Sequence, residues 1–408
     1  GVADRKLGER LAQARRRRAF TQDELSRRSG VSVDLIRKLE QGQRGDARIS
    51  SVHALARALN VRTSDLFGPG AELDESFNGN AVNLLPLRRV LAPPPGVGRT
   101  PSVEPPSLGE IRRDVAALSR VSNGRLGYSE TLTELPDLIL RIRTASEHLP
   151  DEDRQKARHF LARVYLTAGT LATQYRHEDL AYVAITEAIS IADEIDDLIL
   201  RSSAIYHLGW VFMRQGRFTE VEEMATQTSG AIEPSLSRAT PSHIAIWGRL
   251  LVEGSAAAAR NNRPDSAREL LALARSAAAK LEEDRLDYEE HWTAFGPTTV
   301  DIMAAENAMI SGDPKLSLQL GGRISPTDRV LPITWSRHLL TMAEAQYATK
   351  DYKGATRTLA QVRETAPEWL KNQRLARRVV RDLLDSVTVR RAKAMGIADL
   401  ASHLDIRP

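Results

Sequence analysis

Apolar residues recur at helical spacing along nearly the whole chain, beginning with a compact set near the N-terminus. Leu7, Leu11 and Ala14 stand at i, i+4 and i+7 and predict a helix over about residues 5–18. Similar patterns predict two short helices between residues 21 and 42, a fourth over 52–59 and a fifth over 64–67. Five helices are therefore expected within the first 68 residues.

The second and third of these helices carry clear start and stop signals. Thr21 followed by Glu24 is typical of a capping box, and Ser32 can cap the next helix. Gly30 stands at the turn between them, where a positive φ favours glycine, and Gly42 is the expected residue after the last helical turn. The residues expected to lock the pair together are Leu25, Val31, Ile36 and Leu39.

The order of these residues resembles the DNA-binding domain of lambda-repressor-like (XRE-type) regulators. The match covers roughly residues 5–68 and includes Thr21-Gln22-x-x-Leu25, Gly30-Val31-Ser32, Ile36-x-x-Leu39-Glu40-x-Gly42, Ala56-x-Ala58-Leu59-x-Val61 and Asp65-Leu66-Phe67. The resemblance implies a helix-turn-helix fold whose second helix lies in the DNA major groove. It also implies that Arg15 pairs with Glu40 and braces the first helix against this recognition helix.

By this resemblance, the side chains that approach base edges are those of Val33, Asp34 and Lys38. Lys38 can donate to guanine, Asp34 can accept from cytosine, and Val33 can touch a thymine methyl group. Asp34 has a second interpretation, as a residue that caps the start of the helix. Gln22 is expected to grip a phosphate and Arg48 to reach the minor groove. The full predicted DNA-binding set is Gln22, Ser32, Val33, Asp34, Arg37, Lys38, Gln41, Gln43 and Arg48.

The charge distribution agrees with a nucleic-acid partner. Residues 1–68 contain 15 Lys and Arg against 8 Asp and Glu, whereas the whole chain has a net charge of +4, so the remainder is net acidic. This local excess is what phosphate neutralisation requires. The run Arg15–Arg18 has two interpretations, a phosphate-binding surface or a solvated basic face.

A Pro-rich stretch over residues 69–107 separates the N-terminal domain from the rest of the chain and is expected to be a linker. Within it, residues 81–91 are apolar. This segment either docks on a neighbouring domain as a strand or short helix, or belongs to the free linker.

From residue 108 to 408 the pattern is helical, with prolines such as Pro136 at the expected breaks. At five places a small residue is followed twelve positions later by a small or slim one: Gly169/Ala181, Gly209/Val221, Ser255/Ala267, Ala305/Ser317 and Ala343/Ala355. This pattern resembles the tetratricopeptide repeat, best at Leu208-Gly-x-x-Phe212-x-x-x-Gly216-x-Phe218. The fold class predicted for the whole chain is all-α, a five-helix DNA-binding domain followed by a tetratricopeptide-like superhelix.

The first helix of each such repeat lines the concave face of the superhelix. The repeat register places Arg163, Tyr206, Trp210, Arg214, Arg249, Arg260, Glu306, Arg337, Glu344 and Tyr347 there. Converging arginine and aromatic groups can hold a peptide, a carboxylate or an anionic small ligand. The alternative is that the aromatic side chains pack between repeats and the arginines pair with Glu306 and Glu344.

Several other classes of function lack a sequence signal. The chain has no Cys, so no disulfide, thiolate zinc site or cysteine nucleophile is expected. No catalytic constellation, metal-ligand spacing, cofactor motif, secretion signal or membrane-spanning run is recognisable. The expectations are a cytoplasmic protein that is not an enzyme and needs no cofactor.

These patterns are similar to those of peptide-responsive quorum-sensing regulators. The leading hypothesis is a transcription regulator that binds double-stranded palindromic DNA as a homodimer, controlled by a peptide or small-molecule effector in the repeat groove. The alternative is a DNA-bound scaffold whose repeats recruit a protein partner without a diffusible ligand.

Overall fold

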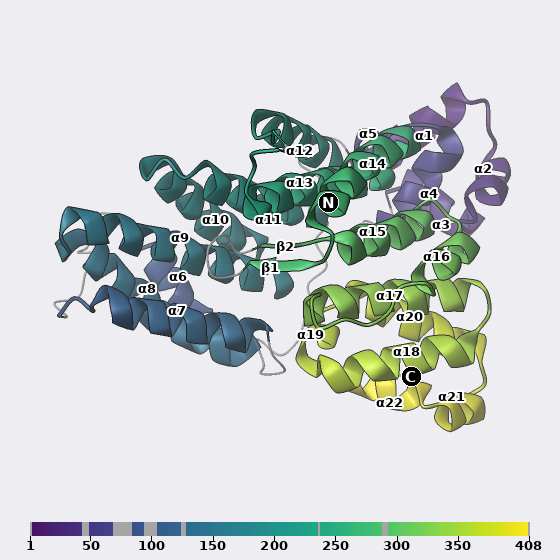
Figure 1. The fold of residues 1–408 in the computed structure, drawn as a ribbon. Helices are drawn as coiled ribbons and strands as arrows, with labels where there is room; N and C mark the ends of the chain where they lie inside the picture. Colours follow the sequence, from purple (N-terminus) through teal and green to yellow (C-terminus); the bar gives the residue numbers. More distant parts are fainter. Residues whose placement is uncertain are drawn as a thin grey trace.

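The structure is a computed structural model that describes residues 2–42, 49–67, 84–93, 104–123, 128–235, 237–287 and 293–406. Over these ranges the chain is almost wholly helical, which confirms the all-α prediction (Figure 1). The N-terminal domain is a bundle of α1 (Val2–Arg17), α2 (Gln22–Ser29), α3 (Val33–Glu40), α4 (Ile49–Leu59) and α5 (Thr63–Phe67).

The described part of the apolar segment in the Pro-rich stretch docks as a short helix, α6 (Leu85–Leu91). Leu87, Val90 and Leu91 are buried against α8 (Tyr128–His148) and α10 (Glu178–Glu194). Arg88 of α6 also pairs with Asp179 of α10 at 2.7 Å. The docked helix therefore ties this part of the stretch to the following domain. Residues 68–83 and 94–103 lie outside the described residues.

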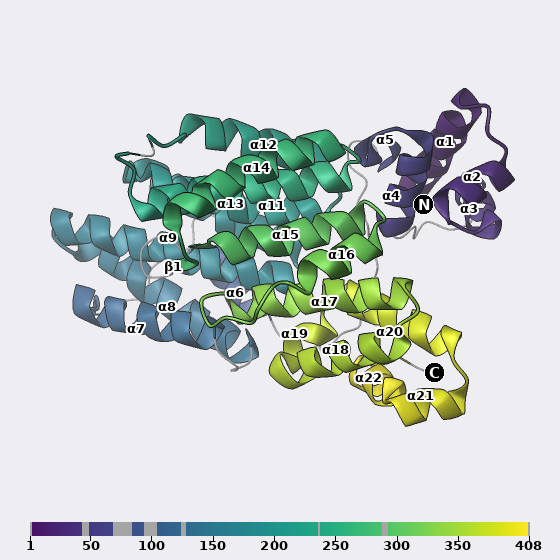
Figure 2. The same cartoon turned by 45° about the vertical axis from the view of Figure 1, so that its right-hand side comes forward.

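The larger domain is a row of antiparallel helix pairs that follows α7 (Leu108–Asn123) and α8 (Figures 1 and 2). The pairs are α9 (Asp151–Gln174) with α10, α11 (Leu198–Arg214) with α12 (Phe218–Ala231), α13 (Pro241–Arg260) with α14 (Pro264–Leu281), α15 (Pro297–Ile310) with α16 (Pro314–Gly321), and α17 (Pro332–Ala348) with α18 (Tyr352–Thr365). Each turn contains one residue with positive φ: Arg176, Gly216, Asn262, Gly312 and Lys350. Each of these five residues stands seven positions after the first small residue of its predicted pair.

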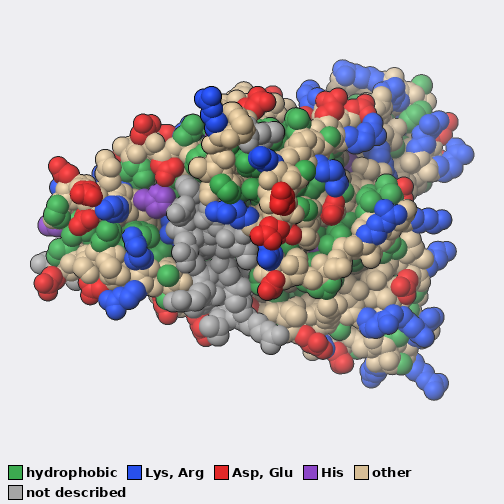
Figure 3. Space-filling model, in the orientation of Figure 1, with side chains coloured by type: hydrophobic (Ala, Val, Ile, Leu, Met, Phe, Trp, Pro, Cys, Tyr) green, Lys and Arg blue, Asp and Glu red, His purple; other side chains and the backbone are tan. Residues whose placement is uncertain are grey.

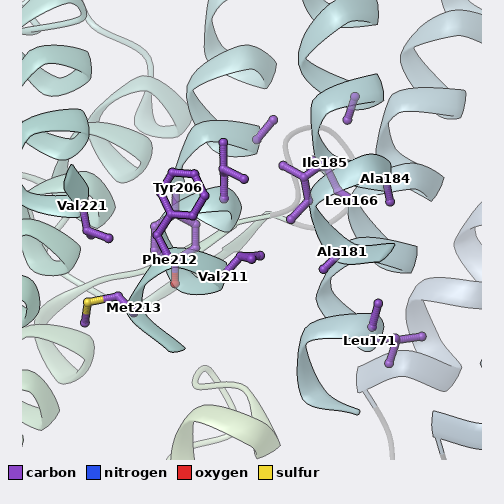
Figure 4. Close-up of a cluster of buried hydrophobic side chains, with 14 of the residues drawn as sticks. Leu166, Leu171, Ala181, Ala184, Ile185, Tyr206, Val211, Phe212, Met213 and Val221 are labelled. Atoms are coloured by element: carbon purple, nitrogen blue, oxygen red, sulfur yellow. The ribbon is translucent and has the colours of Figure 1, made fainter. Parts of the chain in front are cut away.

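The small residues let the paired helices approach closely. A Cβ atom on Gly169 would lie 2.5 Å from the side chain of Ile185 in α10. Ser255 and Ser317 donate across their pairs, to the carbonyl oxygens of Ala267 at 2.7 Å and Ala305 at 2.8 Å. Figure 4 shows the apolar core between neighbouring helices at one such place, with Leu166, Ala181, Ile185, Tyr206, Val211, Phe212 and Val221 among its members.

Two features differ from the sequence expectation. Pro136 does not break a helix but lies inside α8, which continues to His148. A short antiparallel hairpin, β1 (Arg285–Asp287) with β2 (Thr293–Phe295), interrupts the helical pattern between α14 and α15. Its Phe295 is buried against Gly248, where a Cβ atom would lie 2.3 Å from the ring. The hairpin thus fills a space that glycine leaves on α13.

The C-terminal helices pack on the last pair through a separate apolar cluster that includes Trp369, Leu370, Val380 and Leu383. They are α19 (Pro367–Lys371), α20 (Arg374–Ser386), α21 (Val389–Met395) and α22 (Ile397–His403). Within the ranges described, none of the helices combines the length and apolar character needed to cross a membrane.

Candidate nucleic-acid interface

The caps and turn of the α2–α3 pair form as the sequence predicts. Thr21 Oγ1 accepts from the Glu24 backbone N–H at 3.1 Å, and Glu24 Oε2 accepts from the Thr21 backbone N–H at 2.7 Å. Gly30 has a φ of 72° at the turn. Ser32 Oγ then accepts from the Leu35 backbone N–H at 3.3 Å and starts α3. The capping box, the glycine turn and the Ser32 cap are confirmed.

The core of the domain holds α3 in a fixed orientation. Leu25, Val31, Ile36 and Leu39 are buried as expected. Helix α1 approaches α3 at Gly8, where a Cβ atom would lie 2.1 Å from the Leu39 carbonyl oxygen. Only glycine fits such an approach without displacing one helix, so Gly8 helps set the position of the recognition helix.

An ion pair braces α1 against the end of α3. Arg15 Nε and Nη2 donate to the two carboxylate oxygens of Glu40 at 2.7 and 2.9 Å. Gln22 Nε2 donates to the same carboxylate at 2.8 Å. Burial disfavours the charged form of Glu40, but the bonds from Arg15 and Gln22 outweigh it and lower the pKa of Glu40. The predicted Arg15–Glu40 pair is present. Gln22, for which the sequence predicted a phosphate contact, donates to the same Glu40 carboxylate.

The side chains predicted to read bases share the outer face of α3. Asp34 and Arg37 are exposed, and Val33 and Lys38 are partly exposed. Lys38 Nζ lies 2.7 Å from Asp34 Oδ2. The N-cap of α3 is Ser32, so Asp34 stands in the first turn of the helix and not at the cap. Ser32 and Gln41 are exposed at its two ends, whereas Gln43 and Arg48 lie outside the described residues.

The opposite side of the N-terminal domain docks on the turns of the helix pairs. His53 of α4 has Nδ1 2.7 Å from the Arg260 carbonyl oxygen and Nε2 3.0 Å from that of Ile310. Burial, aided by the nearby positive charge of Arg57, lowers the pKa of His53 although both carbonyl contacts oppose this. Thr63 Oγ1 also donates to the Arg260 carbonyl oxygen at 2.6 Å.

A second set of hydrogen bonds reinforces this docking from α5. The backbone N–H and Oγ of Ser64 donate to Asn261 Oδ1 at 3.2 and 3.0 Å. Asn261 is fully buried, and its Nδ2 donates to Thr219 Oγ1 at 3.1 Å. Ser64 Oγ also lies 2.8 Å from Thr219 Oγ1 at the start of α12, so α4 and α5 contact three helix pairs near their turns, while α2 and α3 lie on the side farther from them in Figure 2.

Six of the ten residues expected on the concave face contact one another. Arg260 and Arg337 both donate to Glu306, Arg337 at 2.7 Å. Burial alone would raise the pKa of Glu306, but the two guanidinium groups lower it to about 2. The Arg337 guanidinium lies 4.2 Å from the Trp210 ring centroid, and that of Arg249 lies 4.9 Å from the Tyr206 ring centroid. Tyr206 and Trp210 meet edge to face.

The other four concave-face residues are distributed around this cluster. Arg214 Nη2 donates to Gln174 Oε1 at 3.2 Å, and burial together with the positive charges of Arg176 and Arg337 lowers the pKa of Arg214 to about 9. Arg163 is buried beside Phe160. Tyr347 stacks on Tyr352, and Glu344 accepts from Arg378. Among the described residues no group of three or more His, Asp or Glu side chains is arranged to hold a metal ion.

Two polar positions have no signal in the sequence. Glu253 is buried beside Gly209, and burial raises the pKa of its carboxyl well above the ordinary value although the charge of Arg249 opposes this. Nothing in the sequence distinguishes His53 from the other eight histidines, yet its side chain joins the two domains. Both roles depend on segments far apart in the chain.

Comparison with known proteins supports the assignment of the N-terminal domain. Residues 6–66 match a protein-family model described as a helix-turn-helix domain. No curated protein matches the chain. The family match covers the bundle α1–α5 and agrees with the XRE-type prediction for it, so this domain is a helix-turn-helix domain of the kind that binds DNA.

Proposed function

We propose that this protein is a sequence-specific DNA-binding transcription regulator in which α3 reads bases in the major groove. The observation that carries the proposal is the division of the N-terminal domain into two sides. The outer face of α3 presents Asp34, Arg37 and Lys38, whereas α4 and α5 are hydrogen-bonded to the helix pairs. DNA contact and domain docking can therefore occur together.

One small domain contacts few base pairs, so we expect two copies to bind half-sites about one helical turn apart. The test is selection of DNA fragments by the full chain, followed by footprinting and sedimentation of the complex. The proposal predicts an inverted repeat with two copies on each duplex. A single copy bound to an asymmetric site would contradict the dimer.

We interpret the helix pairs as tetratricopeptide-like repeats whose inner face takes an anionic peptide or small ligand. The support is electrostatic: Arg214 is partly buried, and the positive charges of Arg176, Arg337 and Arg374 act on it, while the negative charge of Glu178 offsets only part of their effect. An anion would relieve this repulsion and would be favoured there.

The test for an effector measures the melting temperature of the full chain with and without fractions of culture extract. Arg214→Met tests the proposed site, and Arg238→Met, which replaces an exposed arginine, is the control. A shift that Arg214→Met abolishes and Arg238→Met retains supports the effector site. A stoichiometric protein that co-purifies, with no shift in any fraction, favours the scaffold alternative.

A further inference from the structure

Positive charge is concentrated at both ends of this chain and not only at the N-terminus. Residues 374–393, which span α20 and α21, contain seven Arg and Lys against two Asp. Between the two basic ends, residues 69–373 contain 34 Lys and Arg against 41 Asp and Glu. The C-terminal helices therefore form a second basic region on an otherwise acidic domain.

The basic side chains of this region project into solvent. Arg381 of α20 and Arg390, Arg391 and Lys393 of α21 are exposed, and none of them forms an ion pair with any residue that the structure describes. Lys350, in the turn before α18, and Lys353, in the first turn of α18, are likewise exposed and without an ion pair among the described residues. We call these six residues the basic edge. Charges left without carboxylate partners are available for an external polyanion.

The basic edge is continuous with the DNA-binding domain. Arg378 of α20 donates from Nη1 to Ser50 Oγ, in the first turn of α4, at 2.6 Å. Arg57 of α4 lies against Gly312 in the turn between α15 and α16. The next helix pair in the row is α17–α18, and its turn contains Lys350. In Figures 1 and 2, α21 lies on the same side of the molecule as α2 and α3. Figure 3 shows Lys and Arg side chains along this side from the N-terminal domain to the C-terminal helices.

We propose that the basic edge binds the phosphate backbone of the same DNA duplex, outside the segment that α3 reads. This inference rests on the proposed DNA-binding function and adds a second contact surface to it. A duplex presents about one negative charge per 1.7 Å of its axis and would match a row of unpaired cations. Such contacts carry no base specificity, so they extend the footprint and raise affinity for all sequences alike.

The test uses the full chain and two duplexes with the same operator, one trimmed to the footprint of α3 and one extended by about one helical turn on each side. The variant is Arg390→Ala/Arg391→Ala/Lys393→Ala. The matched control is Arg112→Ala/Arg113→Ala/Lys156→Ala, which removes three exposed charges from α7 and α9, at the end of the molecule away from α21 (Figure 1). The measured quantity is the slope of log affinity against log salt.

On the extended duplex, we expect the variant to lower the magnitude of the slope by about 2–3, near 0.9 for each lost phosphate contact. On the trimmed duplex the slopes of variant and wild type should agree, and the control should match wild type on both. Equal slopes for variant and wild type on the extended duplex would overturn the inference while leaving operator binding intact. A wild-type chain that prefers no sequence would instead contradict the proposed function itself.

Discussion

Lys38 Nζ lies 2.7 Å from Asp34 Oδ2 on the outer face of α3, so two of the three side chains predicted to read bases are paired with each other. Both side chains remain substantially solvent-exposed, at 44% and 64%. An exposed i,i+4 pair of this kind contributes only about 0.3–0.5 kcal/mol. DNA can therefore separate the pair at little cost in free energy. While the pair is intact, the Asp34 carboxylate partly neutralises the positive charge of Lys38.

Replacing Asp34 with Asn should weaken discrimination between sequences. Without the carboxylate, Lys38 is free to bind any phosphate, so we expect affinity for random DNA to rise several-fold while the preference for the operator falls by about 1 kcal/mol. Fluorescence anisotropy on both duplexes measures this. Glu9→Gln removes the same charge from an exposed position on α1 and should leave the preference unchanged. An unaltered preference in Asp34→Asn would exclude Asp34 as a reader.

Breaking the brace between α1 and α3 should destabilise the N-terminal domain. The side chains of Arg15 and Glu40 are only 13% and 8% exposed, so Glu40→Gln leaves a partly buried guanidinium without its carboxylate. We expect a loss of about 3 kcal/mol in the free energy of unfolding, measured by denaturant titration. Asp65→Asn breaks the exposed Arg62–Asp65 pair and should cost less than about 0.5 kcal/mol. Similar losses in both variants would be inconsistent with a structural brace.

Removing Asn261 should loosen the N-terminal domain from the helix pairs. Asn261→Ala deletes the oxygen that accepts from the Ser64 backbone N–H and Oγ. The chain contains no Cys, so spin labels can be placed at Arg28→Cys and Arg268→Cys without other changes. We expect the distance distribution between the labels to broaden. Thr358→Ala, which removes a bond to Gln346 within the α17–α18 pair, should not alter it. An unchanged distribution in Asn261→Ala would show that these bonds do not hold the domain.

The buried Glu253 should make stability depend on pH. Its pKa is raised in the folded state, chiefly by burial, so the folded chain binds more protons and the free energy of unfolding falls as pH rises above 4.5. Glu253→Gln removes this ionisation. We expect the variant to be more stable than wild type at pH 7, by on the order of 1 kcal/mol, and the difference to vanish near pH 4. Parallel stability curves across this range would contradict a neutral Glu253.

Local features of this fold were readable from the sequence because short-range chemistry determines them. The Thr21–Glu24 box and the Gly30 turn depend on residues a few positions apart. The small residues twelve apart likewise mark close contacts within single helix pairs, as at Ser255 and Ala267. On the outer face of α3 the sequence predicted exposure, but not the pairing of Lys38 with Asp34.

Features that depend on distant segments could not be predicted in this way. The bond from His53 to the Arg260 carbonyl joins residues 207 positions apart, and nothing near His53 in the sequence indicates it. The β1–β2 hairpin forms where Phe295 meets the glycine at position 248, another long-range contact. The basic edge had a sequence signal, since a charge count restricted to α20 and α21 reveals it. The net charge of the whole C-terminal domain is negative, so a count over the whole domain does not reveal the basic segment.

The most direct measurement of the central claim is selection of random DNA duplexes by the full wild-type chain and by Lys38→Ala. If α3 reads bases, wild type will enrich one recurrent sequence, and Lys38→Ala will lose discrimination at one base pair of each half-site by about 1–3 kcal/mol while binding random DNA almost as before. Enrichment of no sequence by wild type, or of the same sequence with equal stringency by Lys38→Ala, would contradict the account.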